Sequence, residues 1–228
     1  MLEIQLLLKF YKGMKRIAVD INGVLRNTIE KFEFVYQKYL IDRDEDFHGL
    51  TYKLDLSGNT EQIDNSEQFE YKKSSEVNSL DLFNHFSFPN REEFFSFLYE
   101  EYAMEIFGHA PSTEMTTFNI FNELYYNLRN ENSILIISNE IGKSKPASLF
   151  FLSKFGCLVE RVLFYSDVTK KNMWDEIDIL LTADPSLLLD IPKNKIVVKY
   201  NTCYNNEINT ELQINSLSEF DSILKKIL

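Results

Sequence analysis

Apolar residues along this chain gather in short runs that are bounded by polar or turn residues. Five of these runs are rich in Ile, Val and Leu, which is typical of strands buried on both faces of a sheet. They cover residues 16–20, 133–138, 161–165, 178–182 and 195–200. We expect each of them to form a β-strand.

Between these strands, apolar residues recur at helical spacing. The pattern predicts a helix from Phe118 to Leu128, a second from Lys145–Pro146 to Phe155, and a last one over residues 216–228. Strands that alternate with helices favour a parallel, doubly wound sheet. The sequence therefore predicts an α/β fold with a sheet of about five strands.

More than a hundred residues separate the first two strands, far beyond an ordinary crossover. We expect residues 14–28 and 115–228 to form the core and residues 29–114 an inserted, mainly helical cap. Apolar residues from Ile29 to Leu40 share a helical face, and Asn90 followed by Glu93 is typical of a helix N-terminus. Residues 41–80 are strongly acidic and broken by Gly, Asn and Ser, so they are either a loosely structured part of the cap or a pair of hairpin strands.

Composition narrows the classes of partner. The chain has 35 acidic and 24 basic residues and a formal charge of −11, which excludes nucleic-acid binding through a general basic surface.

Its two cysteines lie far apart, so we expect no disulfide and a cytoplasmic location. The first ten residues are too short and too polar for a membrane span or signal peptide, and Met14 is an alternative start. A homo-oligomer is compatible with this composition.

The candidate chemistry begins at the end of the first strand. Asp20 closes the apolar run and Gly23 follows in the sequence Asp-Ile-Asn-Gly-Val-Leu. In open α/β sheets, ligands bind at the carboxyl ends of the strands. Asp20 is therefore a candidate nucleophile or metal ligand, and the alternative is an ordinary strand end or helix cap.

This segment resembles motif I of the haloacid dehalogenase (HAD) superfamily, in which the first Asp attacks a phosphoryl group and a second Asp acts as general acid and base. The second position here is Asn22. The apolar segment that ends in Ser138 and Asn139 is similar to motif II, whose hydroxyl donates to a phosphoryl oxygen. The resemblance implies a HAD-like Rossmannoid core, with Gly23, Ser138 and Asn139 near the phosphate.

Motif III of the superfamily supplies a lysine. Lys143 and Lys145 compete with Lys170 and Lys171, and the order of the motifs favours the second pair. Within that pair we prefer Lys170 as the catalytic lysine, with Lys171 as a further phosphate-binding residue, and the choice between the two stays open. Each of these lysines could instead be a solvated surface charge.

Motif IV supplies one or two acids after the fourth strand. Asp184 lies near the expected place, whereas Thr182-Ala183 occupies the position where an acid is usual. Asp178 begins the strand and lies at the wrong end of the sheet. The resemblance implies a Mg²⁺ site made by Asp20, the backbone carbonyl of Asn22 and Asp184.

The segment after the last strand, with Tyr204-Asn205, is similar to 5′(3′)-deoxyribonucleotidase-like members, and the overall style is similar to nucleotidase-like proteins of large bacteriophages. Two functions follow. One is a slow, Mg²⁺-dependent phosphomonoester hydrolase in which Asp20, Asn22, Ser138 and Lys170 are the catalytic set and a small phosphorylated molecule such as a nucleotide is the substrate. The other is a catalytically degenerate protein that binds a phosphorylated ligand or another protein, so enzymatic activity is left open.

Overall fold

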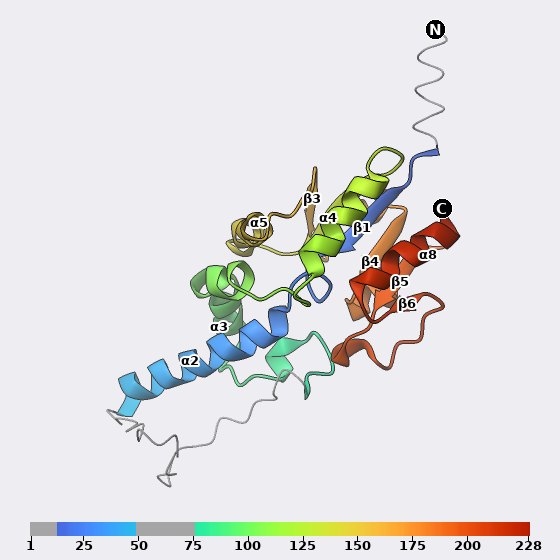
Figure 1. Cartoon of the computed structure of the whole chain (residues 1–228). Helices are drawn as coiled ribbons and strands as arrows, with labels where there is room; N and C mark the ends of the chain where they lie inside the picture. Colours follow the sequence, from blue (N-terminus) through green and yellow to red (C-terminus); the bar gives the residue numbers. More distant parts are fainter. Residues whose placement is uncertain (1–12, 49–75) are drawn as a thin grey trace.

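A six-stranded parallel sheet forms the centre of the computed structural model, which describes residues 13–48 and 76–228 and, within these, the side chains outside 41–48. The strand order is β3-β2-β1-β4-β5-β6 (Figure 1). The strands are β1 (Arg16–Asp20), β2 (Ser133–Asn139), β3 (Val162–Tyr165), β4 (Ile179–Thr182), β5 (Ile196–Tyr200) and β6 (Gln213–Ile214). The α/β prediction with a parallel sheet is confirmed, and the order reverses direction at β1.

The five predicted strands are all present, with bounds that differ by at most one residue. The sixth, β6, has only two residues and pairs with Lys199 and Tyr200 of β5. A two-residue strand leaves no periodicity in the sequence, which explains why the apolar runs did not predict it.

Helices cover both faces of the sheet because alternate residues of each strand point to opposite sides. Ile17 and Val19 of β1 belong to one apolar core, and Ala18 between them belongs to the other. Side chains of α4 (Thr117–Leu128), α5 (Ser144–Lys154) and α8 (Phe220–Ile227) join the first core. Those of α6 (Lys170–Asp175) and α7 (Pro185–Leu188) join the second. The sheet is therefore doubly wound.

The segment between β1 and α4 is mainly helical where it is described. It contains α2 (Thr28–His48), α3 (Arg91–Ser96), the 3₁₀ turn η2 (Leu82–Asn84) and two π-helical turns, η3 (Phe97–Glu101) and η4 (Met104–Gly108). Figure 1 shows α2 and α3 beyond the carboxyl end of β1. The prediction for Asn90 is confirmed, since its side chain accepts from the backbone N–H of Glu93 at 2.9 Å.

Aromatic side chains hold this segment together. Phe32 and Tyr36 of α2 pack against Phe86, Phe88 and Phe97, with ring centroids 4.5–6.5 Å apart. These residues belong to the same apolar core as Ile17 and Val19. The division into a core and a cap at residues 29–114 stays a prediction, and most of the segment 41–80 lies outside the described residues.

In the part of the chain that the structure describes, no helix combines the length and the apolar character needed to cross a membrane.

Candidate active site

Three neighbouring strands end together at the centre of the sheet. Asp20, the last residue of β1, lies level with Ile137, so Ser138 is the next residue on β2. Val19 lies level with Leu181 on β4, which brings Thr182 beside Asp20. Asp20, Ser138 and Thr182 are buried, at 2%, 0% and 0% exposure. Two predicted site residues, Asp20 and Ser138, thus lie on adjacent strand ends.

Asp20 is held by one hydrogen bond to each carboxyl oxygen. The backbone N–H of Asn22 donates to Oδ1 at 3.2 Å, and the Thr182 hydroxyl donates to Oδ2 at 2.8 Å. Burial, and after it the negative charge of Asp184, raise the pKa of Asp20 to about 8. The two hydrogen bonds and the nearby charge of Arg26 lower this pKa but do not offset burial. Asp20 is therefore mostly protonated at neutral pH when no further cation is near.

The loop after Asp20 depends on a glycine. Gly23 has a φ of +77°, a conformation that residues with a side chain rarely adopt. A Cβ atom at this position would lie 1.9 Å from the Tyr204 hydroxyl oxygen and 2.8 Å from the Ala183 Cβ. Gly23 therefore lets the loop pack tightly against Tyr204, whose turn follows β5.

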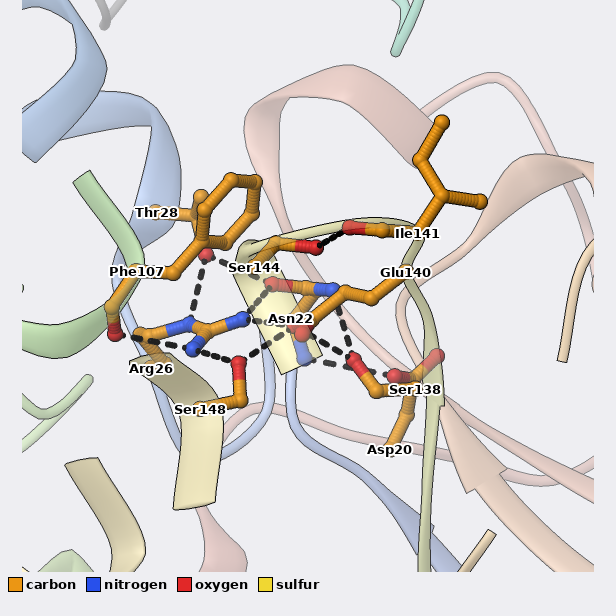
Figure 2. A network of polar contacts seen from close by, with 10 residues as sticks. All are labelled: Asp20, Asn22, Arg26, Thr28, Phe107, Ser138, Glu140, Ile141, Ser144 and Ser148. Carbon is orange, nitrogen blue, oxygen red and sulfur yellow. Dashed lines mark hydrogen bonds and ion pairs between the residues drawn. The ribbon is translucent and has the colours of Figure 1, made fainter. Parts of the chain in front are cut away.

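A buried polar cluster lies directly behind this loop (Figure 2). At its centre is the Arg26 guanidinium, which is 0% exposed and forms an ion pair with Glu140 at 2.5 Å. We call the cluster the Arg26 network; its members are Asn22, Arg26, Thr28, Ser138, Glu140 and Ser148. Arg26 also donates to the carbonyl oxygen of Phe107 in η4 at 2.9 Å. The network therefore joins the site to the segment between β1 and α4.

Asn22 and Ser138 both belong to this network. The amide nitrogen of Asn22 donates to the Ser138 hydroxyl at 3.1 Å, and this hydroxyl donates to Glu140 Oε1 at 2.9 Å. The Ser138 hydrogen, which motif II of HAD-like enzymes directs at a phosphoryl oxygen, is thus directed at Glu140 here.

Asp184 lies two residues beyond Thr182 and is half-buried. Its Oδ1 accepts from the backbone N–H of Ser186 at 2.8 Å and caps α7. Its charge acts on Asp20. Asp178 directly precedes β4 and therefore lies at the opposite end of the sheet, where it forms an ion pair with Arg16 at 2.9 Å. Asp184 thus lies just past the carboxyl end of β4, and its role as a metal ligand stays a prediction.

The two predicted lysines make contacts away from Asp20. Lys170 donates to the backbone oxygen of Ser186 at 2.8 Å and lies 3.7 Å from an Asp190 oxygen. Lys170 and Lys171 both line a groove of about 480 Å³ whose walls do not include Asp20. Asn139 ends β2 and is exposed. The structure therefore does not bring Lys170, Lys171 or Asn139 into the hydrogen-bonded cluster around Asp20.

Sequence reasoning missed Arg26 and Glu140. Arg26 follows the apolar pair Val24-Leu25, and Glu140 directly follows the motif II segment. A charged residue at each of these two places, of opposite sign, is a signal that could have suggested a buried pair. Thr182 was noted only as a missing acid, whereas the structure shows that its hydroxyl contacts Asp20.

Comparison with known proteins supports the fold. No family model matches the chain, and no curated protein matches it. Among solved structures, a haloacid dehalogenase-like hydrolase from Burkholderia xenovorans is 9% identical with a TM-score of 0.55, covering 95% of this chain and 99% of its own.

Two further structures are similar over nearly their whole length. A HAD-superfamily hydrolase of subfamily IA from Geobacter sulfurreducens is 13% identical, with a TM-score of 0.50 and coverage of 93% and 97%. A haloacid dehalogenase-like protein from Streptococcus pneumoniae is 9% identical, with a TM-score of 0.50 and coverage of 93% and 99%. Identities this low show the fold alone. The chain therefore has the HAD-like Rossmannoid fold of the structures it resembles.

Proposed function

We propose that this protein is a slow phosphomonoester hydrolase that uses Asp20 as nucleophile and requires Mg²⁺. The observation that carries the proposal is the position of Asp20, Ser138 and Asp184 at the carboxyl ends of the neighbouring strands β1, β2 and β4, beside the point where the strand order reverses. This is where open α/β sheets bind their ligands. The substrate class is a small phosphorylated molecule, for which a nucleotide is the leading candidate, and the expected location is the cytoplasm.

The donor set around Asp20 suits Mg²⁺. Hard oxygen ligands are what this ion prefers, commonly one or two carboxylates completed by water and substrate phosphate. The carboxylates of Asp20 and Asp184 and the backbone carbonyl of Asn22 would hold it. Among the described residues no group of three His, Cys, Asp or Glu side chains lies together, so the ion would keep part of its shell from other ligands. When bound, Mg²⁺ supplies positive charge that favours the ionised nucleophile and the transferring phosphoryl group.

The reaction would proceed in two steps. An ionised oxygen of Asp20 attacks phosphorus, the bond from phosphorus to the ester oxygen breaks, and the leaving alkoxide takes a proton from water. A water molecule then attacks the phosphorus of the aspartyl-phosphate and releases inorganic phosphate, and Asp20 is restored. Asn22 cannot give or accept the protons in these steps at neutral pH, and positioned acid–base groups typically contribute 10²–10⁴-fold. Both steps are therefore slowed, and the second most when the leaving group is good.

The alternative function is binding without turnover. Two observations favour it: every N–H of Arg26 is used within the protein, and Lys170 contacts Ser186 rather than Asp20. A phosphate dianion would then rely on Mg²⁺ and backbone N–H groups for its charge. A protein of this kind would bind a phosphorylated ligand at the same strand ends and release it unchanged.

A burst experiment separates the two functions. With p-nitrophenyl phosphate and Mg²⁺, the native chain should release about one equivalent of nitrophenolate per site quickly and further equivalents slowly, because Asn22 does not activate the water of the second step. Mass spectrometry of the quenched protein should locate one phosphoryl group on the peptide that contains Asp20. Asp20→Asn should abolish both signals.

Asp190→Asn is the matched control, since Asp190 is exposed and its carboxylate lies 3.7 Å from Lys170, outside the hydrogen-bonded cluster around Asp20. It should behave as the native chain does. Phosphate binding with neither burst nor phosphorylated Asp20 would establish the alternative, and turnover that survives Asp20→Asn would exclude Asp20 as the nucleophile.

A further inference from the structure

The two ends of the Asn22 carboxamide face partners of opposite kind. Its oxygen accepts from Arg26 Nη2 at 2.7 Å and from the Thr28 hydroxyl at 2.8 Å. Its nitrogen donates to the Ser138 hydroxyl oxygen at 3.1 Å. The surroundings of this side chain therefore supply two donors on one side and one acceptor on the other, which matches an amide and not a carboxylate.

The acceptor side is set by Glu140. A serine hydroxyl has a single hydrogen, and Ser138 directs it at Glu140 Oε1 at 2.9 Å. The Ser138 oxygen is therefore free to accept from Asn22. With an aspartate at position 22, two carboxylates would require the same hydrogen, and one of them would face the serine oxygen without a proton between them.

Arg26 cannot resolve this conflict because its donors are all used. Its five N–H groups bond to Thr28, the Phe107 carbonyl, Ser148, Asn22 and Glu140 (Figure 2). Arg26 is 0% exposed and Glu140 is 1% exposed. A second carboxylate at the part-buried position 22, beside this ion pair, would have no cation of its own, which is unfavourable.

We infer that the Arg26–Glu140 ion pair is a positioning device that holds position 22 as a fixed amide, so that a carboxylate at 140 and a carboxylate at 22 exclude each other. Arg26 and Glu140 orient Asn22 and, through it, the Ser138 hydroxyl. The single carboxylate that this network accommodates lies at 140. Replacing Asn22 by aspartate therefore destabilises the fold on its own. The Arg26 network accommodates a carboxylate at 22 only when residue 140 carries no charge.

A double-mutant cycle tests this inference. Asn22→Asp and Glu140→Gln exchange an amide and a carboxylate with almost no change in shape, and the double variant moves the carboxylate from 140 to 22 beside the same Arg26. Each single variant should lower Tm by roughly 5–15 °C, since Asn22→Asp adds a part-buried carboxylate with no cation of its own and Glu140→Gln removes the carboxylate that pairs with the buried Arg26. The double variant should lie closer to the native Tm than either single variant. Asn130→Asp, on an exposed turn, is the control for added charge and should leave Tm unchanged.

The outcome decides the inference even if a variant does not fold. A folded double variant beside an unfolded Glu140→Gln supports it. Additive losses, a double variant less stable than both singles, or an Asn22→Asp variant as stable as the native chain would overturn it.

A second measurement rests on the proposed function. It distinguishes a failure of the proposed hydrolase function from a failure of the positioning role of Arg26 and Glu140. In the double variant, the slow phase of nitrophenolate release should accelerate about 10²-fold, because an aspartate at 22 can activate water. If no variant shows a burst, the proposed function fails and the Tm cycle still decides the positioning role. If Asn22→Asp alone is stable and accelerates the slow phase, the positioning role is wrong.

Discussion

Asp20 is an acid in an environment that favours its neutral form. Its pKa is raised to about 8, first by burial and second by Asp184. A carboxyl that binds its proton more tightly in the folded state stabilises the fold below its unfolded pKa near 4, and this contribution is lost as the pH rises through about 8. The proposed nucleophile is therefore also a source of instability at alkaline pH.

Asp20→Asn should remove the loss of stability that Asp20 causes at alkaline pH. In a buffer that chelates metal ions, the free energy of unfolding of the variant relative to the native chain should rise between pH 5 and pH 8.5, by at most about 4 kcal/mol. Urea unfolding at both pH values measures it, and any constant effect of the amide cancels in the comparison. Asp190→Asn should show a flat difference, and a flat difference for Asp20→Asn as well would mean that Asp20 is ionised at neutral pH.

Gly23 and Gly156 form a natural pair for a test of the loop. Both have positive φ angles, +77° and +61°, but a Cβ at Gly156 would meet nothing within 4 Å. Gly156→Ala should therefore cost about 1 kcal/mol from backbone strain alone. Gly23→Ala should cost about 3 kcal/mol or more, because the new methyl group also collides with Tyr204.

Chemical denaturation of both variants measures these costs, and Tyr204→Phe in the Gly23→Ala background should recover part of the loss by removing the hydroxyl at 1.9 Å. Equal losses for the two alanine variants would show that Tyr204 moves aside and that the packing of the loop is not tight.

At the scale of elements, the carboxyl and amino ends of the parallel strands have different roles. The carboxyl ends of β1, β2 and β4 place Asp20, Ser138 and Thr182 together. The opposite ends of β1 and β4 are tied by Asp178, which accepts from the backbone N–H, Nε and Nη2 of Arg16 at 2.9–3.1 Å. These bonds hold the pKa of Asp178 at about 2. This end contributes to stability and takes no part in the proposed chemistry.

Asp178→Ala should separate stability from activity. The variant should lose about 1.5–3 kcal/mol of stability at pH 7, the range for hydrogen bonds to charged groups, while any burst with p-nitrophenyl phosphate persists. A carboxyl with a lowered folded pKa stabilises above pH 4 and loses this contribution as the pH falls toward 2, so the difference from the native chain should shrink in acid. Thermal unfolding at pH 7 and pH 3.5 measures the trend, and a loss of the burst in a folded variant would contradict the assignment.

At the scale of the whole molecule, metal binding and folding stability are linked. A ligand that binds only the folded chain raises its stability by an amount that grows with ligand concentration over Kd. Mg²⁺ should therefore raise Tm at pH 8, where Asp20 loses its proton most readily. The increase should be smaller at pH 6, since Mg²⁺ and the proton compete for the Asp20 carboxyl.

Asp184→Asn tests the site of this effect. Asparagine retains the oxygen that caps α7, so the fold should stay near native stability while the Tm increase with Mg²⁺ falls. Asp190→Asn should keep the full increase. An increase that Asp184→Asn leaves intact would place the bound Mg²⁺ elsewhere on this acidic chain.

The parts of the fold that periodicity can encode were predictable from the sequence. Apolar runs such as residues 133–138 predict buried strands, and Asn90 followed by Glu93 predicts a helix N-terminus, because both signals lie within a few neighbouring residues. The place of Asp20 at a strand end followed from the same pattern. The two-residue strand β6 and the contacts of Lys170 did not, since they depend on what lies beside them in space.

By itself, the amino-acid sequence determined the α/β class, the strand order along the chain and the residue at the end of β1 where chemistry is expected. Only the tertiary structure decided what surrounds that residue. Arg26 and Glu140 are 114 positions apart, and whether they meet depends on the register of β1 against β2. The charge state of a buried group depends on its neighbours in three dimensions, and no local pattern records them. For this reason the sequence shows Asn22 only as the loss of an acid, whereas the structure shows an amide whose oxygen and nitrogen are both hydrogen-bonded.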